Sequence, residues 1–193
     1  RQYIFTKQII EQKNWNEEWE KSFQPVIVEN FCAIRASFHE PVRNAKYEII
    51  ITPKMSFGTG HHATTFQMIR WMAEIDFENR RVLDFGTGTG ILAVLAEKMN
   101  ASEIVAIDND DWSIRNAEEN LQLNNCNRII LKQADFPDVQ GSFDIVLANI
   151  NRHVIIAHLH SLKEHLKIDG MLLVSGLLTD DEKDIVAACK DNG

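Results

Sequence analysis

The glycine-rich stretch at residues 82–92 constrains the fold of this chain more than any other feature. It reads Val-Leu-Asp-Phe-Gly-Thr-Gly-Thr-Gly-Ile-Leu: apolar residues lead into an acid, three glycines follow at alternate positions, and a second apolar run begins. Such a pattern predicts a buried strand, a tight turn and the start of a helix. Glycines let the backbone turn sharply and bring its N–H groups close to a ligand, so we expect a ligand at this turn.

The spacing of the glycines indicates the class of ligand. A dinucleotide fingerprint has glycines at its first, third and sixth positions, where they seat a pyrophosphate on a helix N-terminus. Here the sixth position is Ile91, and the third glycine comes one residue earlier, at Gly90. Asp84 precedes the turn, where a carboxylate would repel a pyrophosphate but suit a cation. S-adenosylmethionine fits, since it has a sulfonium, an ammonium and no phosphate, and NAD is disfavoured.

Composition and charge exclude several classes of protein. A chain of 193 residues with 45% hydrophobic residues predicts one domain, or one with an appendage. No apolar run approaches the roughly 18 residues of a membrane span, and residues 1–11 lack the apolar core of a signal peptide. The net charge of −8 argues against broad nucleic-acid binding and suits a basic protein partner. The three cysteines lie far apart, so we expect a cytoplasmic protein without a metal site.

Before the glycine-rich stretch, the chain predicts a linker and an appendage. Residues 5–23 place isoleucine, tryptophan and phenylalanine on one helical face, and Pro25 ends that pattern. Residues 26–28, 31–38 and 48–52 are β-rich and predict a small antiparallel sheet. We expect a linker helix region at 1–24, a β appendage at 25–52 and a ligand-binding core at 53–193. The core opens with a mobile loop at 53–65 and a helix to about residue 75.

After that stretch, strands and helices alternate. This order predicts a parallel, doubly wound α/β sheet, and the almost wholly apolar run at 143–148 indicates a central strand. A Thr-x-x-Glu pattern at 179–182 predicts the cap of the last helix. The expected strands are 81–84, 103–107, 128–132, 143–148 and 170–175, and the expected helices are 91–100, 111–124, 152–166 and one ending near 190.

Polar residues follow three of these strands, at the edge where ligands bind in open α/β sheets. Asp108 comes 22 residues after Gly86, a spacing at which an acid accepts hydrogen bonds from ribose hydroxyls. The alternative for Asp108 is to cap the next helix, and Asp110 competes for that position. Asp135 could accept from an adenine amino group or be a simple loop acid. Asn149 ends the fourth strand and should face the same crevice as Gly86.

With the glycine turn and Asp108, the chain resembles the class I S-adenosylmethionine-dependent methyltransferases. It is more narrowly similar to the PrmA family, bacterial enzymes that methylate amino groups of the eleventh protein of the large ribosomal subunit. The similarity runs from about residue 12 to the end of the chain. The motifs that carry it are Trp15 to Trp19 with Phe23 and Pro25, Phe57-Gly58-Thr59-Gly60 with His62 and Thr64-Thr65, the stretch 84–92, and Ala148-Asn149-Ile150.

The resemblance implies a Rossmann-like fold, S-adenosylmethionine as cofactor with S-adenosylhomocysteine as product, and methylation of a lysine side chain or an N-terminal amine of a large-subunit ribosomal protein. From the net charge of −8, we expect no direct nucleic-acid binding. The resemblance assigns a catalytic role to Asn149, whose neutral carbonyl can orient an amine, and a lid to Phe57 and Thr59. The residues that it implies for cofactor binding are Phe57, Thr65, Asp84, Gly86, Gly88, Asp108 and Asn149.

Several features depart from the family pattern. His61 stands where threonine is usual, Ala63 where proline is usual, and Asn151 where leucine is usual. The family's N-terminal recognition domain and the last strand pair of the class I sheet have no counterpart here, so we expect a fragment of a longer protein with an exposed fifth strand. An RNA or small-molecule methyltransferase of the same fold and a non-catalytic S-adenosylmethionine-binding module are the alternatives.

Overall fold

The computed structural model describes residues 23–53, 62–135 and 139–192, which form two sheets and the helices that pack on them. The large sheet has the strand order β6-β5-β4-β7-β8, and every pairing in it is parallel. This confirms the predicted parallel α/β sheet, with β4 in the middle and β7 in its interior. The strands are β4 (Arg81–Phe85), β5 (Glu103–Asp108), β6 (Ile129–Gln133), β7 (Phe143–Asn149) and β8 (Leu166–Ser175).

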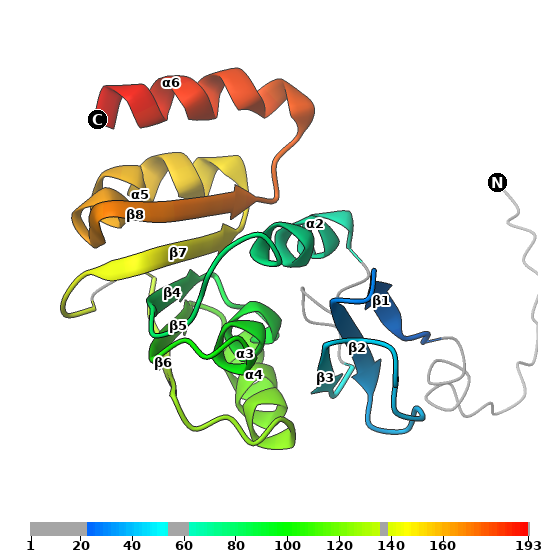
Figure 1. The fold of residues 1–193 in the computed structure, drawn as a ribbon. Coiled ribbons are helices and arrows are strands. Elements are labelled where there is room, and N and C mark those ends of the chain that lie inside the picture. The colour runs from blue at the N-terminus through cyan, green and yellow to red at the C-terminus, as the bar shows by residue number, and fades with distance from the viewer. Residues whose placement is uncertain (1–22, 54–61, 136–138, 193) are drawn as a thin grey trace, which may run out of the picture.

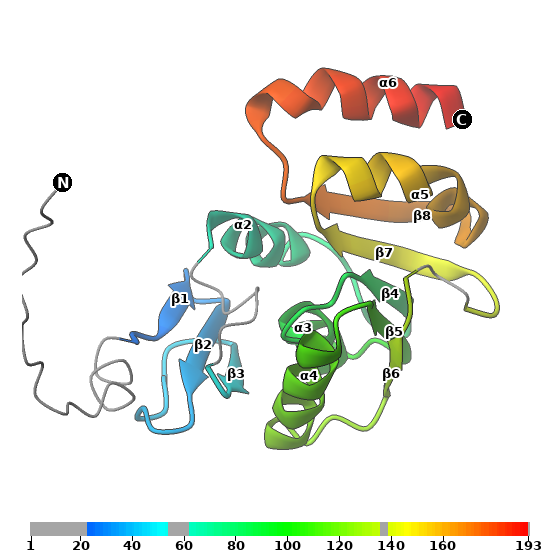
Figure 2. The same cartoon turned by 180° about the vertical axis from the view of Figure 1, so that it is seen from behind.

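Helices cover both faces of the large sheet. The glycine turn leads into α3 (Ile91–Lys98), and α4 (Asp111–Leu123) follows β5. Both helices lie between the large sheet and the small sheet (Figure 1). On the opposite face lies α5 (Arg152–Glu164), and α6 (Glu182–Asn192) packs on α5 (Figure 2). Successive side chains of each strand point to opposite faces, so alternate residues belong to two separate apolar clusters, one on each face of the sheet.

The small sheet consists of β1 (Val26–Val28), β2 (Cys32–Ala36) and β3 (Tyr47–Ile51). β1 and β2 pair antiparallel as expected, but β2 and β3 run parallel, so the prediction of a wholly antiparallel appendage is wrong. A short turn would have produced a hairpin, whereas residues 37–46 carry the chain back along the sheet before β3 begins. Glu48 holds that connection: its Oε1 accepts from Val42 N at 2.7 Å and from Arg35 Nε at 2.9 Å.

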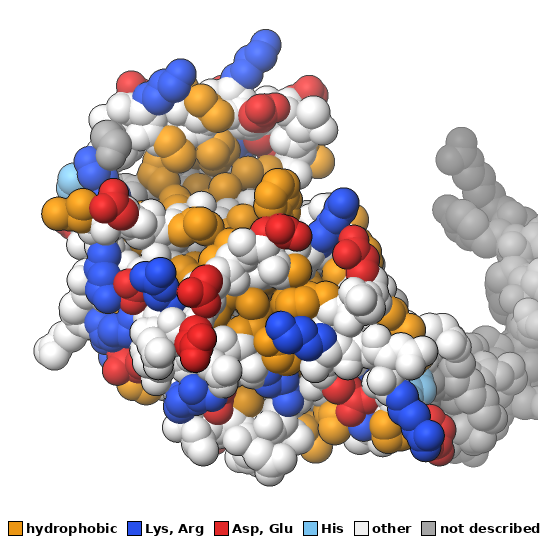
Figure 3. Space-filling model, in the orientation of Figure 1, with side chains coloured by type: hydrophobic (Ala, Val, Ile, Leu, Met, Phe, Trp, Pro, Cys, Tyr) orange, Lys and Arg blue, Asp and Glu red, His pale blue; other side chains and the backbone are white. Residues whose placement is uncertain are grey.

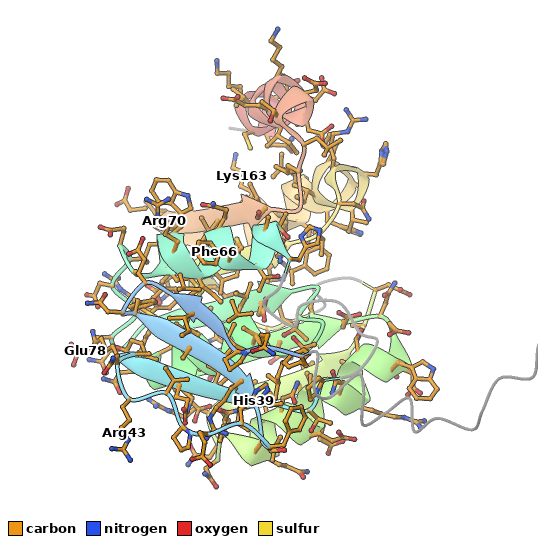
Figure 4. All side chains as sticks on the ribbon, turned by 90° about the vertical axis from the view of Figure 1, so that its right-hand side faces the viewer. His39, Arg43, Phe66, Arg70, Glu78 and Lys163 are labelled. Carbon is orange, nitrogen blue, oxygen red and sulfur yellow. The ribbon has the colours of Figure 1, made fainter. Side chains whose placement is uncertain are left out.

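Helix α2 (Ala63–Met72) joins the small sheet to the large one. It packs beside β1 as well as β7 and β8, and Arg70 on its exposed side forms an ion pair with Glu29 at 3.5 Å. Figure 4, seen from the side of the small sheet, shows α2 with Phe66 and Arg70 running along that sheet, and His39 lies on the connection after β2. The helix thus ties the appendage to the edge where ligands are expected.

Some element boundaries differ from the sequence-based predictions. β8 begins at Leu166, four residues earlier than expected, and its pairing with β7 is irregular between Phe143 and Ile145. The predicted cap of the last helix is wrong, because residues 179–181 form a 3₁₀ turn in which Asp181 Oδ2 accepts from Leu178 N at 2.9 Å. The expected linker helix and most of the loop at 53–65 lie outside the described residues. Within the described residues, no helix is long and apolar enough to cross a membrane.

Candidate active site

A cavity of about 630 Å³ opens at the carboxyl ends of the parallel strands, where the sequence predicts ligand binding. Its size lies in the range of small-molecule sites. Gly86, Gly88, Asp108 and Asn149 all line it, as predicted, and so does Asp135. The predicted lid residues Phe57 and Thr59 lie outside the described part of the chain. Among the described residues, no cluster of histidine, cysteine and acidic side chains could hold a metal ion.

The glycine turn combines left-handed backbone with close packing. Gly86, Gly88 and Gly90 all have positive φ, between 55° and 78°. A Cβ on Gly86 would lie 2.3 Å from Ile150 Cγ2, so only glycine fits there. Gly90 precedes α3 and packs against α4, where a Cβ would lie 3.1 Å from Leu121 Cδ1. The first two glycines therefore shape the cavity, and the third serves helix packing.

Asp84 supports the turn from the protein interior. Its side chain is 1% exposed and is not among the groups that line the cavity. Thr87 Oγ1 donates to Asp84 Oδ2 at 2.6 Å, and burial raises the pKa of this carboxyl to about 7. The structure therefore places the Asp84 carboxyl beneath the turn, where it bonds to Thr87, and direct contact between Asp84 and a cofactor stays a prediction.

Two acids lie between the end of β5 and the start of α4 and have separate roles. Asp110 caps the helix by accepting from Ser113 N at 2.9 Å. Asp108 instead lines the cavity, where its Oδ2 accepts from Gly88 N at 2.8 Å and its Oδ1 from Asp110 N at 3.0 Å. The helix-cap alternative for Asp108 is thus ruled out by Asp110, and its carboxylate stays at the ligand edge.

Asn149 presents an acceptor that is not satisfied within the described structure. The side chain is 8% exposed, and its Nδ2 donates to Thr65 Oγ1 on α2 at 3.2 Å. Its Oδ1 is buried and has no hydrogen-bond donor among the described residues. Thr65 is 1% exposed and does not line the cavity, so it positions the Asn149 amide, which differs from the predicted direct contact. His62 caps α2, and it lines the cavity with Thr64.

Sequence reasoning missed the wall of the cavity that follows β8. Gly176 has φ +84°, and a Cβ there would lie 2.4 Å from Ile150 O, so this position also requires glycine. Leu177 and Leu178 continue the wall, and Val154 of α5 also lines the cavity. A glycine directly after the strand next to Asn149 was the signal that could have identified this wall.

Comparison with known proteins decides the family. The family model described as "Ribosomal protein L11 methyltransferase (PrmA)" matches residues 2–193. The chain belongs to the PrmA family. Curated members of this family from Porphyromonas gingivalis and Bacteroides thetaiotaomicron are 44% and 40% identical, over 87% and 95% of this chain. The chain spans only 59% and 66% of the length of those two relatives.

A solved structure supports the same PrmA assignment. The crystal structure of the ribosomal protein L11 methylase from Lactobacillus delbrueckii subsp. bulgaricus is 31% identical and superposes with a TM-score of 0.81. The match covers 88% of this chain and 89% of that one. The parallel sheet described above is thus the PrmA fold, and the cavity lies at the carboxyl ends of its strands.

Proposed function

We propose that this chain carries the catalytic site of an S-adenosylmethionine-dependent protein N-methyltransferase that acts on amino groups of ribosomal protein L11, a cytoplasmic target. The observation that carries the proposal is that Gly86, Asp108 and Asn149 line one cavity, and that Asn149 Oδ1 has no hydrogen-bond donor among the described residues. The names of the relatives at 40–44% identity support the same reaction and substrate.

The cavity fits S-adenosylmethionine better than a dinucleotide. Its described lining contains Asp108 and Asp135 but no lysine or arginine, so a pyrophosphate would find no compensating charge. The Asp108 carboxylate would accept from the ribose hydroxyls, and the backbone at Gly86 and Gly88 leaves room for close approach of the ligand. Asp135 would accept from the adenine amino group.

Asn149 is the residue that we assign to the acceptor amine. A lysine amine has a pKa of about 10.4 in water and must be neutral to act as a nucleophile. Burial disfavours the ammonium form, and a neutral amide carbonyl accepts an N–H hydrogen bond without the charge by which a carboxylate would stabilise the ammonium. Thr65 holds the Nδ2 of Asn149, which leaves Oδ1 for the amine. When bound, S-adenosylmethionine supplies a methyl group that is already activated, so alignment is the main task of the protein.

Titration calorimetry with S-adenosylmethionine and NAD, followed by transfer of a labelled methyl group to purified L11, tests the proposal. We expect saturable binding of S-adenosylmethionine alone and labelling of L11. Labelling of RNA in its place would indicate the alternative substrate class, and binding without any transfer would indicate a non-catalytic module. Binding of NAD would contradict the assignment of the cavity.

Replacing Asn149 with alanine separates the two roles that this residue could have. We expect Asn149→Ala to lower the turnover number at least tenfold while S-adenosylmethionine affinity falls less, because the lost acceptor acts on the amine. Single-turnover methyl transfer and calorimetry on the same preparations measure both quantities. An equal loss of turnover and affinity would make Asn149 a cofactor ligand only.

A further inference from the structure

Three asparagines of α4 and its C-terminal cap follow the free edge of β3. Asn116, Asn120 and Asn124 are spaced four residues apart, so their side chains leave the helix from one face. β3 pairs with β2 along one edge, and the described residues contain no strand on its other edge. The backbone groups of that edge therefore need partners from elsewhere, since buried N–H and C=O groups are rarely left unpaired.

The asparagine side chains supply those partners. Ile50 N donates to Asn124 Oδ1 at 3.0 Å, and Ile50 O accepts from Asn124 Nδ2 at 2.6 Å. Thr52 N donates to Asn120 Oδ1 at 2.8 Å, and Thr52 O accepts from Asn116 Nδ2 at 3.2 Å. A side-chain amide carries the same donor and acceptor as a peptide group, so the three residues replace a neighbouring strand. The geometry matches, because four helical residues rise about 6 Å and two strand residues about 6.7 Å.

Asn120 differs from Asn124 within this asparagine ladder, which comprises Asn116, Asn120 and Asn124. Its Nδ2 donates at 2.8 Å to the carbonyl oxygen of Thr89, which lies inside the glycine turn, and its side chain is fully buried. One side chain therefore joins the end of the small sheet to the turn that lines the cavity. Among the described residues, the side chain of Asn124 bonds only to the backbone of β3 and, at 2.7 Å, to Asn120 O. A substitution at Asn124 is therefore a matched control, because it weakens the attachment of α4 to the small sheet without removing a bond to the glycine turn.

We propose that Asn120 is a positioning residue for the cofactor. The turn contains three glycines in left-handed conformations, which have wide conformational freedom unless neighbouring groups hold them. Asp84 holds the turn through Thr87 Oγ1, and Asn120 holds it through the Thr89 carbonyl. Through Thr52, Asn120 also couples the turn to the small sheet. This inference rests on the proposed function, because it takes S-adenosylmethionine as the ligand of the turn.

Comparison of Asn120→Ala with Asn124→Ala tests the inference. Both variants lose hydrogen bonds to β3, so both should melt at lower temperature. We expect only Asn120→Ala to bind S-adenosylmethionine more weakly, by about tenfold, whereas Asn124→Ala stays within about twofold of the unaltered chain. Calorimetry measures the affinities, and near-UV circular dichroism verifies that each variant is folded at the temperature used.

Amide hydrogen exchange in the unaltered chain gives a readout that does not depend on how the variants fold. Coupling between two sites is reciprocal, so saturating S-adenosylmethionine should slow exchange at the Thr52 amide by about fivefold, and at the Ile50 amide by less. Equal slowing at both amides, or equal affinities of Asn120→Ala and Asn124→Ala, would overturn the role of Asn120 and leave the proposed function intact. Failure of the unaltered chain to bind S-adenosylmethionine would overturn both.

Discussion

Asp108, the last residue of β5, and Asp110, the N-cap of α4, lie two residues apart and have different partners. Asp108 faces the cavity and Asp110 caps the helix. We expect Asp108→Ala to weaken S-adenosylmethionine binding at least tenfold, because hydrogen bonds to a charged group contribute about 1.5–3 kcal/mol. Asp110→Ala is the matched control: it should lower the free energy of unfolding by about 1 kcal/mol and leave the affinity within twofold. Calorimetry with near-normal affinity for Asp108→Ala would contradict the ribose assignment.

The buried Asp84 makes stability depend on pH. Burial raises the pKa of its carboxyl to about 7 from an ordinary value of 3.8. Between about pH 4 and 7 the folded chain therefore keeps a proton that the unfolded chain has released, so this group lowers the free energy of unfolding as pH rises through that window. The decrease is at most about 4 kcal/mol, and Asp84→Asn should remove it.

Urea unfolding of the unaltered chain and of Asp84→Asn at pH 5 and pH 7.5 measures this effect. Comparison of the two proteins isolates the effect of Asp84, because every other titrating group is present in both. A difference in unfolding free energy that is the same at both pH values would show that Asp84 keeps its ordinary ionisation in the folded chain.

At the scale of elements, strand register brings the predicted site residues together. Phe85 at the end of β4 is paired with Ile107 of β5 and Ala148 of β7. The residues that follow these three, Gly86, Asp108 and Asn149, therefore emerge side by side at one edge. On the next strand, Ser175 pairs with Asn149, which places Gly176 against Ile150. A shift of register in any of these pairs would separate the groups that line the cavity.

At Gly86, the glycine turn lies so close to Ile150, which follows β7, that there is no room for a side chain. We expect Gly86→Ala to lower the free energy of unfolding by at least about 1–2 kcal/mol from its positive φ alone, with a further loss from contact with Ile150. S-adenosylmethionine affinity should fall as well. The double variant Gly86→Ala/Ile150→Ala should recover the part due to contact but not the part due to φ. Unfolding by urea distinguishes these parts, and a single variant as stable as the unaltered chain would contradict the packing.

At the scale of the whole molecule, the two apolar clusters bury opposite faces of the large sheet, but β8 remains at its edge. Within the described residues β8 pairs only with β7, as the sequence predicts for the fifth strand. Apolar side chains gather on the surface between α6 and β8 (Figure 3). Large apolar side chains are exposed on both elements: Met171 of β8 is 45% exposed and Val186 of α6 is 44% exposed. The opposite end of the sheet is different, because α4 packs against β6 and β5.

Cofactor binding should stabilise the whole molecule, because the cavity draws residues from elements on both faces of the large sheet. S-adenosylmethionine at one hundred times its dissociation constant should add about 2.7 kcal/mol to the free energy of unfolding. For a domain of this size the melting temperature should rise by about 5–10 °C. Thermal melts with and without the cofactor measure the shift. Asp108→Ala at the same concentration should show a smaller rise, and an equal rise would contradict the role of that carboxylate.

The sequence by itself determined the strand, turn and helix at 82–92, the parallel α/β order and the strand ends that carry Gly86, Asp108 and Asn149. Those inferences succeeded because hydrophobic periodicity and the steric freedom of glycine act over a few neighbouring residues. Only the tertiary structure decided the direction of β3, the inward orientation of Asp84 and the contact of Gly176 with Ile150. It also decided the alignment of the asparagine ladder with β3. Each of these depends on which groups meet through space, and no local pattern in the chain specifies that.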